Sequence, residues 1–224
     1  MKPELSQSTL YYLVTKMKLI TLRPLPEQVF VACSGGLDSV SVVVRACELK
    51  RKVTLAFFHH RDEFSDMEEE FVRNLSRDFG LDIITSQAPT KALKSKEKTW
   101  RDFRQPWFQS LPGTVLTGHN LDDAVEWYIM TCLQGQGYFM NYENGNVKKP
   151  FLLTKKVALR DYLVSRKVSW LEDPSNYEVE FTPRNRVRHN ILPEALKINP
   201  GLYKVVEKGI LKKEGRYVHQ IPGL

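Results

Sequence analysis

Four short hydrophobic runs recur along the first half of the chain. They are rich in β-branched and aromatic residues and are bounded by turn-forming residues, a pattern typical of buried strands. The runs cover Gln28–Cys33, Lys52–Phe58, Leu81–Ser86 and Thr114–Thr117. The pattern therefore predicts four buried strands.

Segments with helical spacing alternate with these strands. They lie at Val40–Lys50, Glu63–Phe79, Thr99–Gln109 and Leu121–Leu133. The second segment is expected to carry its large apolar residues on one face, namely Phe64, Met67, Phe71, Leu75 and Phe79. The alternation predicts an α/β fold, with a doubly wound, mostly parallel sheet, right-handed crossovers and helices on both faces.

The second half of the chain departs from this alternation. Gln134–Lys149 is rich in Gly and Asn and is expected to be a loop, whereas Thr154–Lys167 and Pro183–Ile191 have helical features. A chain of 224 residues can form one main hydrophobic core. We therefore expect a main domain over residues 1–195 with a small helical C-terminal extension, and a short tail over residues 196–224.

Composition and charge indicate which kinds of partner and which compartment to expect. No apolar run approaches the roughly 18 residues that a bilayer requires, so no membrane partner is expected. Met1–Ile20 carries charges and has no cleavage site of small residues, which favours an amphipathic helix over a signal peptide. Cys33, Cys47 and Cys132 lie far apart, which argues against a zinc site, an iron–sulfur cluster or a disulfide framework and fits a reducing cytoplasm. The net charge of +7 favours an anionic partner such as nucleic acid.

The first predicted strand is followed by Ser34-Gly35-Gly36-Leu37-Asp38-Ser39. In an open parallel sheet, ligands bind beyond the carboxyl ends of strands, where the turn into the next helix offers backbone N–H groups to an anion. Two adjacent glycines let a phosphate approach the backbone, and the two serines can donate hydroxyl hydrogen bonds. A carboxylate beside phosphates makes electrostatic sense when a divalent cation such as Mg²⁺ bridges the two. The alternative is a tight turn in which Ser and Asp are local caps.

This hexapeptide resembles SGGxDS, the signature of the PP-loop ATP pyrophosphatase superfamily. Members of that superfamily cleave ATP between the α and β phosphates and activate a carbonyl oxygen of the substrate as an adenylate. The resemblance implies an adenine-nucleotide α-hydrolase-like fold. It places ATP at Ser34, Gly35, Gly36, Leu37, Asp38 and Ser39, and Mg²⁺ at Asp38.

Glu97 to Arg104, with the sequence EKTWRDFR, resembles the E-x-x-x-R-x-x-R helix of the tRNA(Ile)-lysidine synthetases. Arg101 and Arg104 share a helical face and could clamp phosphates or stabilise developing negative charge. The resemblance implies a catalytic role for Arg101 and RNA contact for Arg104. Surface arginines on an amphipathic helix are the alternative.

A second block, TGHNLDDAVE from Thr117 to Glu126, resembles the G/A-H-x-L-D-D-x-x-E motif of the same family. The resemblance implies nucleotide contact at Gly118 and catalytic roles for His119, Asp122, Asp123 and Glu126. Three carboxylates near ATP need Mg²⁺ or a cationic group to offset their charge. Helix capping is the alternative role for either aspartate, and capping or packing is the alternative for the histidine.

A third block joins WLEDPSN, from Trp170 to Asn176, to the R-N-x-x-R and I-L-P segments between Arg184 and Pro193. Its order and spacing resemble the W-x-E-D-x-S-N and R-N-x-x-R-x-x-x-L-P block of the family. Such a basic stripe can bind a phosphate backbone, so Arg184, Asn185 and Arg188 are expected at the RNA. Ion pairs with Glu172 and Asp173 are the alternative for the two arginines.

Taken together, the resemblance implies one reaction. ATP adenylates the C2 carbonyl of the wobble cytidine of tRNA(Ile) with a CAU anticodon, and the ε-amine of free lysine displaces AMP to form lysidine. ATP and Mg²⁺ are the expected cofactors, and this tRNA and lysine the expected partners, in the cytoplasm. The oligomeric state stays open, with a homodimer as one option.

Three features depart from the family pattern. His59-His60-Arg61-Asp62 lacks the Gly-Leu of the family's H-H-G-L-R loop, Trp127 stands where Thr is common, and we expect a short form without C-terminal domains. The rival functions are a tRNA thiolation enzyme of the superfamily, a synthetase acting on a small metabolite, and a non-catalytic module that binds RNA or nucleotide. The spacing of the cysteines argues against the first rival.

Overall fold

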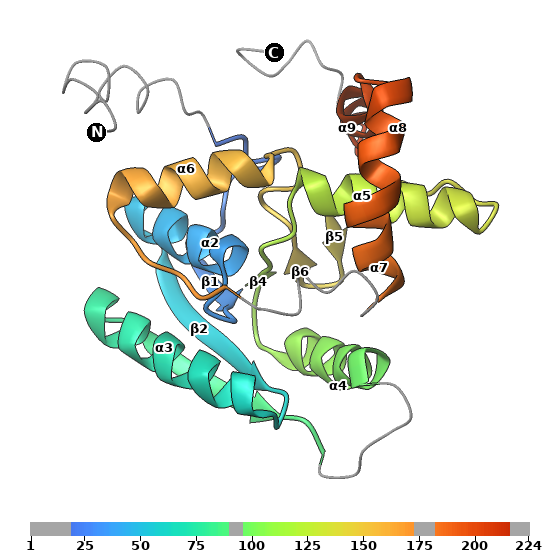
Figure 1. Ribbon diagram of the computed structural model, residues 1–224. Coiled ribbons are helices and arrows are strands. Elements are labelled where there is room, and N and C mark those ends of the chain that lie inside the picture. The colour runs from blue at the N-terminus through green and yellow to red at the C-terminus, as the bar shows by residue number, and fades with distance from the viewer. Residues whose placement is uncertain (1–18, 90–95, 173–181, 216–224) are drawn as a thin grey trace, which may run out of the picture.

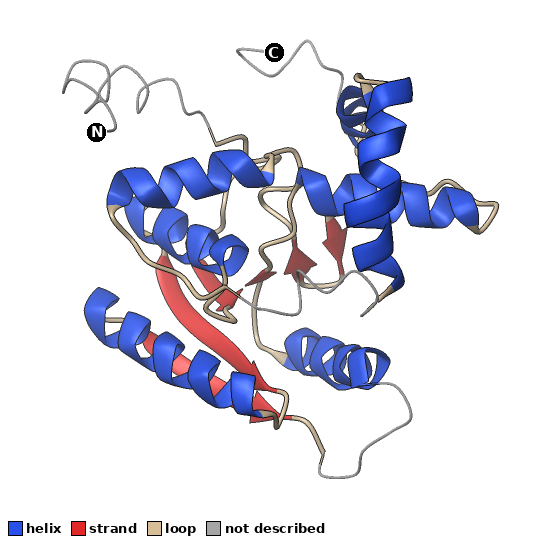
Figure 2. Ribbon diagram, in the orientation of Figure 1, coloured by secondary structure: helices blue, strands red, loops and turns tan. Residues whose placement is uncertain are grey.

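The computed structural model describes residues 19–89, 96–172 and 182–215, and a six-stranded sheet lies at its centre (Figures 1 and 2). The strands β1 (Gln28–Ala32), β2 (Lys52–His59), β3 (Asp82–Gln87) and β4 (Val115–Leu116) pair in parallel. The predicted strands are confirmed to within one residue at each end. The helix expected at Met1–Ile20 falls outside the described residues up to residue 18.

The strands are ordered β3-β2-β1-β4-β6-β5 across the sheet. The chain therefore moves outward from β1 to β3 and then crosses back to place β4 on the other side of β1. This reversal makes β1 and β4 the topological switch point, where open α/β sheets bind their ligands. The predicted doubly wound, mostly parallel architecture is confirmed.

The helices between the strands also follow the prediction. They are α2 (Leu37–Glu48), α3 (Glu63–Phe79), α4 (Lys96–Ser110) and α5 (Leu121–Leu133). Because side chains alternate across a strand, Val31 and Leu55 pack in the core cluster with α2, whereas Phe30 and Ala32 pack with Phe108 of α4. The sheet is thus buried on both faces.

The buried face of α3 differs from the expected stripe. Val72 and Leu75 are buried, and Phe71 and Phe79 pack against the core, but Met67 is 56% exposed. The buried stripe also includes Ser65 and Ser76, which are small enough to fit against the sheet. Hydrophobic periodicity does not register a buried serine. The prediction therefore placed Met67 on the buried face and left out Ser65 and Ser76.

The segment Gln134–Lys149, expected to be a loop, contains two short strands. β5 (Glu143–Asn144) and β6 (Val147–Lys148) form an antiparallel pair, and β6 extends the sheet beside β4 in parallel. Gly145 turns the chain between them with φ of +60°. The loop prediction was wrong here because two-residue strands are too short to show an alternating pattern.

The remaining helices pack against α2 and α5. They are α6 (Lys156–Arg166), α7 (Pro183–Arg186), a π-helical turn η2 (Val187–Ile191), α8 (Leu192–Ile198) and α9 (Leu202–Lys213). Figure 1 shows α6 beside α2, and α7 and η2 contact α5. Val206, Ile210 and Leu211 of α9 are buried in one cluster with Val125 of α5. Among the described residues, no helix is both long and apolar enough to cross a bilayer.

Candidate active site

Two loops meet at the switch point of the sheet. The first, Ser34 to Gly36, follows β1, and the second, Thr117 to Asn120, follows β4, the strand that pairs with β1. The carboxyl ends of neighbouring parallel strands lie at the same edge of a sheet, so the two loops are brought together there. The structure therefore juxtaposes two motifs that lie about 80 residues apart in the sequence.

The backbone of the first loop requires a glycine at Gly35. Its φ is +79°, and a Cβ there would lie 3.0 Å from Phe71 Cδ1 and 3.3 Å from Leu171 Cδ1. The carbonyl of Gly35 accepts a hydrogen bond from the N–H of Leu171 at 2.9 Å. This bond joins the loop to the first residues of the WLEDPSN block, whose residues 173–176 lie outside the described part of the chain.

Gly36 begins α2 without a side-chain cap. Backbone N–H groups in the first turn of a helix have no partner within the helix, so an uncapped start can bind an anion. A Cβ at Gly36 would meet only ordinary contacts, at 3.6 Å from Ser34 Oγ and 3.9 Å from the Leu171 carbonyl. The fold would accommodate a side chain at position 36, and because the residue is glycine this space is unfilled.

The two serines and the leucine of the loop have different surroundings. The Ser39 hydroxyl donates to the Gly36 carbonyl at 3.0 Å and accepts from the Ser34 N–H at 3.2 Å, so it shapes the loop from inside. Ser34 is exposed, and Leu37 is buried in the core. Ser34 is thus the accessible hydroxyl, and Leu37 can offer a ligand only its backbone.

Gly118 is a position of close backbone approach. A Cβ there would lie 2.6 Å from the carbonyl carbon of Asp38 and 2.8 Å from the N of Ser39. No side chain fits such a gap without a shift of the backbone. Gly118 therefore allows the second loop to pack against the start of α2.

Asp38 lies between the two loops and has partners from both. Asn120 Nδ2 donates to its Oδ1 at 2.9 Å, and Lys156 Nζ lies 3.4 Å from its Oδ2. Burial and then the charge of Asp123 raise the pKa of Asp38 to about 6, although Lys156 and Asn120 act to lower it. A carboxyl in these surroundings gains from a nearby cation.

Asn120 organises the start of α5. Its Oδ1 accepts from the N–H groups of Asp122 and Asp123, at 2.9 Å and 3.2 Å, and Asp123 Oδ2 accepts from the Asn120 N–H at 2.9 Å. This reciprocal arrangement is a capping box. Because Asn120 also donates to Asp38, the cap of α5 fixes the orientation of that carboxyl.

Asp123 and Glu126 form an ion-pair network with two arginines. Arg184 contacts Asp123 Oδ1 at 2.5 Å and Glu126 Oε2 at 2.6 Å, and Arg188 Nε contacts Glu126 Oε1 at 2.7 Å. Glu126 is only 2% exposed. Burial acts to raise the pKa of Asp123, but Arg184 and the Asn120 N–H outweigh it and lower that pKa.

The arginines expected at RNA are thus partners of the carboxylates expected in catalysis. The sequence offered Glu172 and Asp173 as alternative partners, whereas the structure joins the arginines to α5. The network links α5 to α7 and η2. Asn185, expected beside Arg184 at the RNA, is buried, and its N–H is capped by Thr182 Oγ1 at 3.1 Å.

Asp122 accepts hydrogen bonds from α6 and α9. Its Oδ2 accepts from the N–H of Lys156 at 2.7 Å, and its Oδ1 accepts from the Tyr203 hydroxyl at 2.8 Å. These bonds connect α5 to the start of α6 and to α9. The contacts of Asp122 join three helices, and its catalytic role stays a prediction.

His119 lies beside the network as a neutral imidazole. Its Nδ1 is 2.9 Å from Thr117 Oγ1. Burial lowers the pKa of His119 to about 4, the charges of Lys149, Arg184 and Arg104 lower it further, and Asp123 opposes them. At pH 7 the ring is uncharged, so it can form hydrogen bonds to a ligand without adding positive charge.

The two arginines of the EKTWRDFR block lie on α4. Arg104 is partly buried, and it is close enough to His60 and His119 for its charge to act on the pKa values of both. Only the backbone is described at Arg101, which is in the helix one turn earlier. The structure thus brings Arg104 toward the site.

Two contributors were not among the predicted site residues. Lys156 lies at the start of α6 and supplies the cation that faces Asp38, and Asn120 supplies its hydrogen-bond donor. Asn120 could have been found from its place before Leu-Asp-Asp, since Asn is a favoured N-cap. Lys156 follows another lysine in a basic stretch, and nothing local distinguishes it.

The donor set fits Mg²⁺ held partly by substrate phosphates. Within the described ranges, no group of three or more His, Cys, Asp or Glu side chains is arranged to hold a metal. Mg²⁺ bound with nucleotides uses one or two carboxylates together with phosphate oxygens and waters. Asp38 meets this requirement as a single carboxylate beside the uncapped start of α2.

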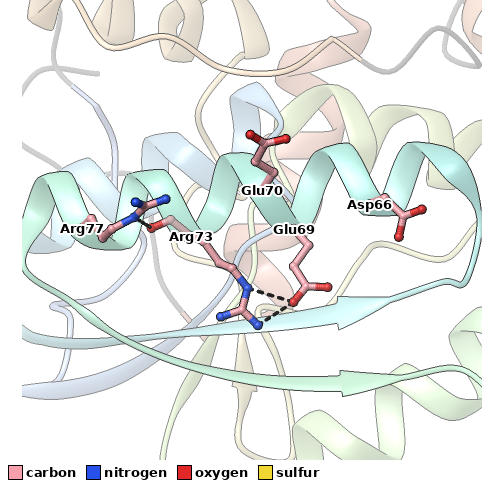
Figure 3. A pocket seen from close by; sticks show the side chains of 5 residues that line it. All are labelled: Asp66, Glu69, Glu70, Arg73 and Arg77. Carbon is pink, nitrogen blue, oxygen red and sulfur yellow. Dashed lines mark hydrogen bonds and ion pairs between the residues drawn. The ribbon is translucent and has the colours of Figure 1, made fainter.

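A shallow depression on α3 lies apart from the predicted site residues (Figure 3). It is lined by Asp66, Glu69, Glu70, Arg73 and Arg77. Arg73 contacts Glu69 Oε1 through Nε at 2.9 Å and Nη2 at 2.6 Å. Charges paired at a spacing of four residues on one helix face are typical of a solvated surface.

Comparison with known proteins identifies the family. A family model described as a PP-loop domain matches residues 11–195. The chain belongs to the PP-loop family. The match covers both loops of the switch point and the arginines of α7 and η2, so the PP-loop resemblance of the SGGLDS segment is confirmed.

Curated relatives at about 30% identity bear one name. The chain is 32% identical over 202 residues to the tRNA(Ile)-lysidine synthase of Lactiplantibacillus plantarum, covering 81% of this chain and 45% of the relative. It is 30% identical over 192 residues to that of Bacteroides thetaiotaomicron, covering 79% of this chain and 45% of the relative. The chain therefore spans less than half the length of these relatives.

Proposed function

We propose that this PP-loop protein forms lysidine on tRNA(Ile) by adenylating a cytidine with ATP and transferring lysine to it. The observation that carries the proposal is the meeting of Asp38, Asn120 and Lys156 at the switch point, where an uncapped helix start offers N–H groups to phosphates. The name of the curated relatives supports the choice of tRNA(Ile) as the substrate.

ATP would bind with its phosphates at the first loop. The N–H groups at the start of α2 and the exposed Ser34 hydroxyl are the donors for phosphate oxygens. Asp38 would hold Mg²⁺, which supplies positive charge for the departing pyrophosphate. Lys156, which faces Asp38 at 3.4 Å, is close enough to contact the same phosphates.

The proposed reaction has two displacements. The C2 carbonyl oxygen of cytidine attacks the α phosphorus, and the bond to the bridging oxygen breaks to release pyrophosphate. The unprotonated ε-amine of lysine then attacks C2, AMP leaves with the C2–O bonding electrons, and the amine loses its proton. Esterification is needed because the carbonyl oxygen alone is a poor leaving group.

The side chains around this chemistry have distinct proposed roles. Arg101 and Arg104 on α4 supply positive charge for the transition state. His119 hydrogen-bonds the base or the nucleotide, since a pKa of about 4 makes it a weak proton acceptor at pH 7. Asp123 and Glu126 act through Arg184 and Arg188, whose orientation they fix.

The proposed RNA contacts are Arg104, Arg184 and Arg188, whereas the buried Asn185 is not accessible to RNA in this structure. Carboxylates already neutralise part of the charge of Arg184 and Arg188. A guanidinium has five N–H donors, so an arginine in an ion pair can still donate to a phosphate. RNA would then meet a surface whose geometry is set by the network.

The described cysteines disfavour the thiolation alternative. Cys33 is buried, and desolvation raises its pKa to about 11, so it is a thiol at neutral pH. Burial likewise raises the pKa of Cys47, and Cys132 is exposed. Sulfur transfer requires a reactive thiolate.

The experiment is a single reaction with a mass-resolved product. The purified chain is incubated with ATP, Mg²⁺, labelled lysine and tRNA(Ile) bearing the CAU anticodon, and the nucleosides are analysed by mass spectrometry alongside pyrophosphate release. We expect a labelled cytidine derivative whose mass equals cytidine plus lysine minus water. Asp38→Ala is expected to abolish both signals while the protein remains folded.

The matched control is Asp161→Asn, which removes an exposed carboxylate on α6. We expect it to leave product formation unchanged. Pyrophosphate release with a sulfur-containing product would replace the proposal with thiolation. Absence of pyrophosphate release with any tRNA would assign the chain to the non-catalytic class.

A further inference from the structure

A groove beside the candidate site exposes aromatic rings next to two lysines. It has a volume of about 470 Å³ and lies between the middle of α5, the segment that follows α5, and the end of α9. Its lining includes Trp127, Tyr138, Met140, Lys149 and Lys213. Trp127 is 39% exposed and Tyr138 is 54% exposed, which is unusual for side chains that gain so much from burial.

The groove is preformed because its floor is packed. Phe139 stacks on Tyr128 of α5, with ring centroids 5.0 Å apart and planes 3° from parallel. On its other side Phe139 packs on Gly209 of α9, where a Cβ would lie 2.3 Å from the ring. Gly135 and Gly137, with φ of +81° and +67°, turn the chain so that Tyr138 lies at the edge.

The groove is positively charged. Lys149 Nζ donates to the Asn141 carbonyl at 3.0 Å, and Lys213 Nζ donates to the Phe139 carbonyl at 3.1 Å. An ammonium has three donors, so each lysine retains donors for a ligand. The described residues that line the groove include no carboxylate, and the nearby Glu214, whose charge acts on the pKa of Lys149, is paired with Arg23. The surface is therefore complementary to an anion that also has a flat apolar face.

The groove is adjacent to the proposed reaction centre. Trp127 follows Glu126 directly and lies six residues after the first residue of α5, a distance of about 9 Å along the helix axis. Lys149 is also close enough to His119 for its charge to contribute to the lowered pKa of that residue. A polymeric ligand that extends from the switch point along α5 would therefore reach the groove.

We propose that this groove binds an unpaired nucleotide next to the reacting base, with the base stacked on Trp127 and Tyr138 and the phosphate at Lys149 and Lys213. Aromatic rings bind unpaired bases by stacking, and ammonium groups neutralise the phosphate backbone. The inference rests on the proposed RNA substrate and extends it. It does not depend on the identity of the group that is transferred.

The test measures RNA binding by the full chain without ATP or lysine. The probes are an RNA hairpin with the anticodon loop of tRNA(Ile) and a blunt RNA duplex of the same length, at fixed salt. Trp127→Ala and Tyr138→Ala are each expected to weaken hairpin binding about tenfold, the size of one lost stacking contact, and to leave duplex binding unchanged. Trp127→Phe is expected to retain most of the hairpin affinity.

Charge and spectroscopy provide independent readouts. Lys213→Gln is expected to lower the salt slope of hairpin binding by about one, whereas the aromatic variants keep the wild-type slope. Wild-type tryptophan fluorescence is expected to be quenched by the hairpin, and Trp127→Phe to lose that quenching. The controls Ile198→Ala and Lys197→Gln change exposed side chains of α8, outside the groove, and are expected to match the wild type in hairpin affinity relative to duplex affinity.

The outcomes separate this inference from the proposed function. Loop-dependent binding that requires Trp127, in a protein that forms no lysidine, would support the groove and contradict the proposed reaction. Lysidine formation with aromatic variants that bind the hairpin as tightly as the wild type would overturn the groove alone. Equal losses for hairpin and duplex, or no binding of the hairpin by the wild type, would also overturn it.

Discussion

Asp38 is a partly buried carboxylate, and its surroundings contain groups that stabilise its charged form and groups that destabilise it. Lys156 and Asn120 stabilise the charged form, but burial and Asp123 disfavour it more, and the pKa rises to about 6. A carboxyl with a raised pKa in the folded state binds protons more tightly there than in the unfolded chain. Its contribution to stability is therefore full below the unfolded pKa of about 3.8 and is lost as the pH rises through about 6.

Asp38→Asn is therefore expected to stabilise the ligand-free protein at neutral pH. The amide oxygen can still accept from Asn120, and the cost of a partly buried charge is removed. We expect a gain of roughly 1–2 kcal/mol in unfolding free energy at pH 7, after allowance for partial exposure, and no difference from wild type below about pH 4. Denaturant titrations between pH 4 and pH 8 measure this.

The difference in stability between Asp38→Asn and the wild type separates the contribution of Asp38 from that of the histidines. His119 acts in the opposite direction, because its lowered pKa makes stability fall as the pH drops through 6.5 toward 4. That contribution is common to both proteins and cancels in the difference. A variant that is less stable than the wild type at pH 7 would mean that the contact with Lys156 outweighs the desolvation of Asp38.

Individual residues also show what the sequence could and could not indicate. The sequence identified Asp38, and the structure places it at the switch point. This residue was predictable because its six-residue motif directly follows a recognisable strand. Lys156 was missed because it contacts Asp38 across 118 positions of sequence, and no local pattern encodes such a pairing. For Arg184 the sequence allowed both a phosphate and an ion pair, and only the packed structure shows Glu126 as its partner.

At the scale of elements, the two loops of the site use their glycines differently. Gly118 is needed for packing, since its Cβ would lie 2.6 Å from a backbone atom of Asp38. Gly36 has φ of −74° and ψ of 161°, which any residue adopts, and a Cβ there meets nothing closer than 3.6 Å. A glycine that the fold does not require points to a ligand that approaches the backbone.

Gly118→Ala is therefore expected to affect stability, and Gly36→Ala to affect ATP binding. Gly118→Ala should lower the unfolding free energy by about 1–3 kcal/mol, the usual cost of overpacking. Gly36→Ala should change it by less than about 1 kcal/mol but weaken ATP binding at least about tenfold, because its methyl group occupies the approach of the phosphates. Thermal denaturation and nucleotide titration measure the two effects. Unchanged ATP affinity in Gly36→Ala would mean that the phosphates do not bind beside Gly36.

Elements were predictable where they were long and periodic. The bounds of α3 and α5 match those expected from hydrophobic spacing, because each helix buries a stripe over several turns. The β5–β6 hairpin was not predictable, since its two-residue strands form by pairing with each other and, through β6, with β4. The π-helical turn at Val187–Ile191 likewise shows no signal in the sequence beyond a helical pattern.

At the scale of the whole molecule, α9 decides whether the end of the described chain is a tail or part of the core. Val206 and Ile210 are fully buried and pack with Val125 of α5, the helix that begins at the candidate site. Burying one such side chain contributes about 1.5–3 kcal/mol, and a domain is stable by only about 5–15 kcal/mol in total. The contacts of α9 therefore represent a large part of the stability of the molecule.

Ile210→Ala is accordingly expected to destabilise the whole molecule. Truncating a buried isoleucine costs about 2–5 kcal/mol, and the loss should appear in one cooperative transition that includes the sheet. Urea denaturation followed both by tryptophan fluorescence and by far-ultraviolet circular dichroism measures this, with Val205→Ala, which is 43% exposed on the same helix, as the control. If α9 behaved as a separate tail, Ile210→Ala would leave the main transition at the wild-type midpoint. A shared transition would instead mean that α5, and with it the cap that orients Asp38, depends on the packing of α9.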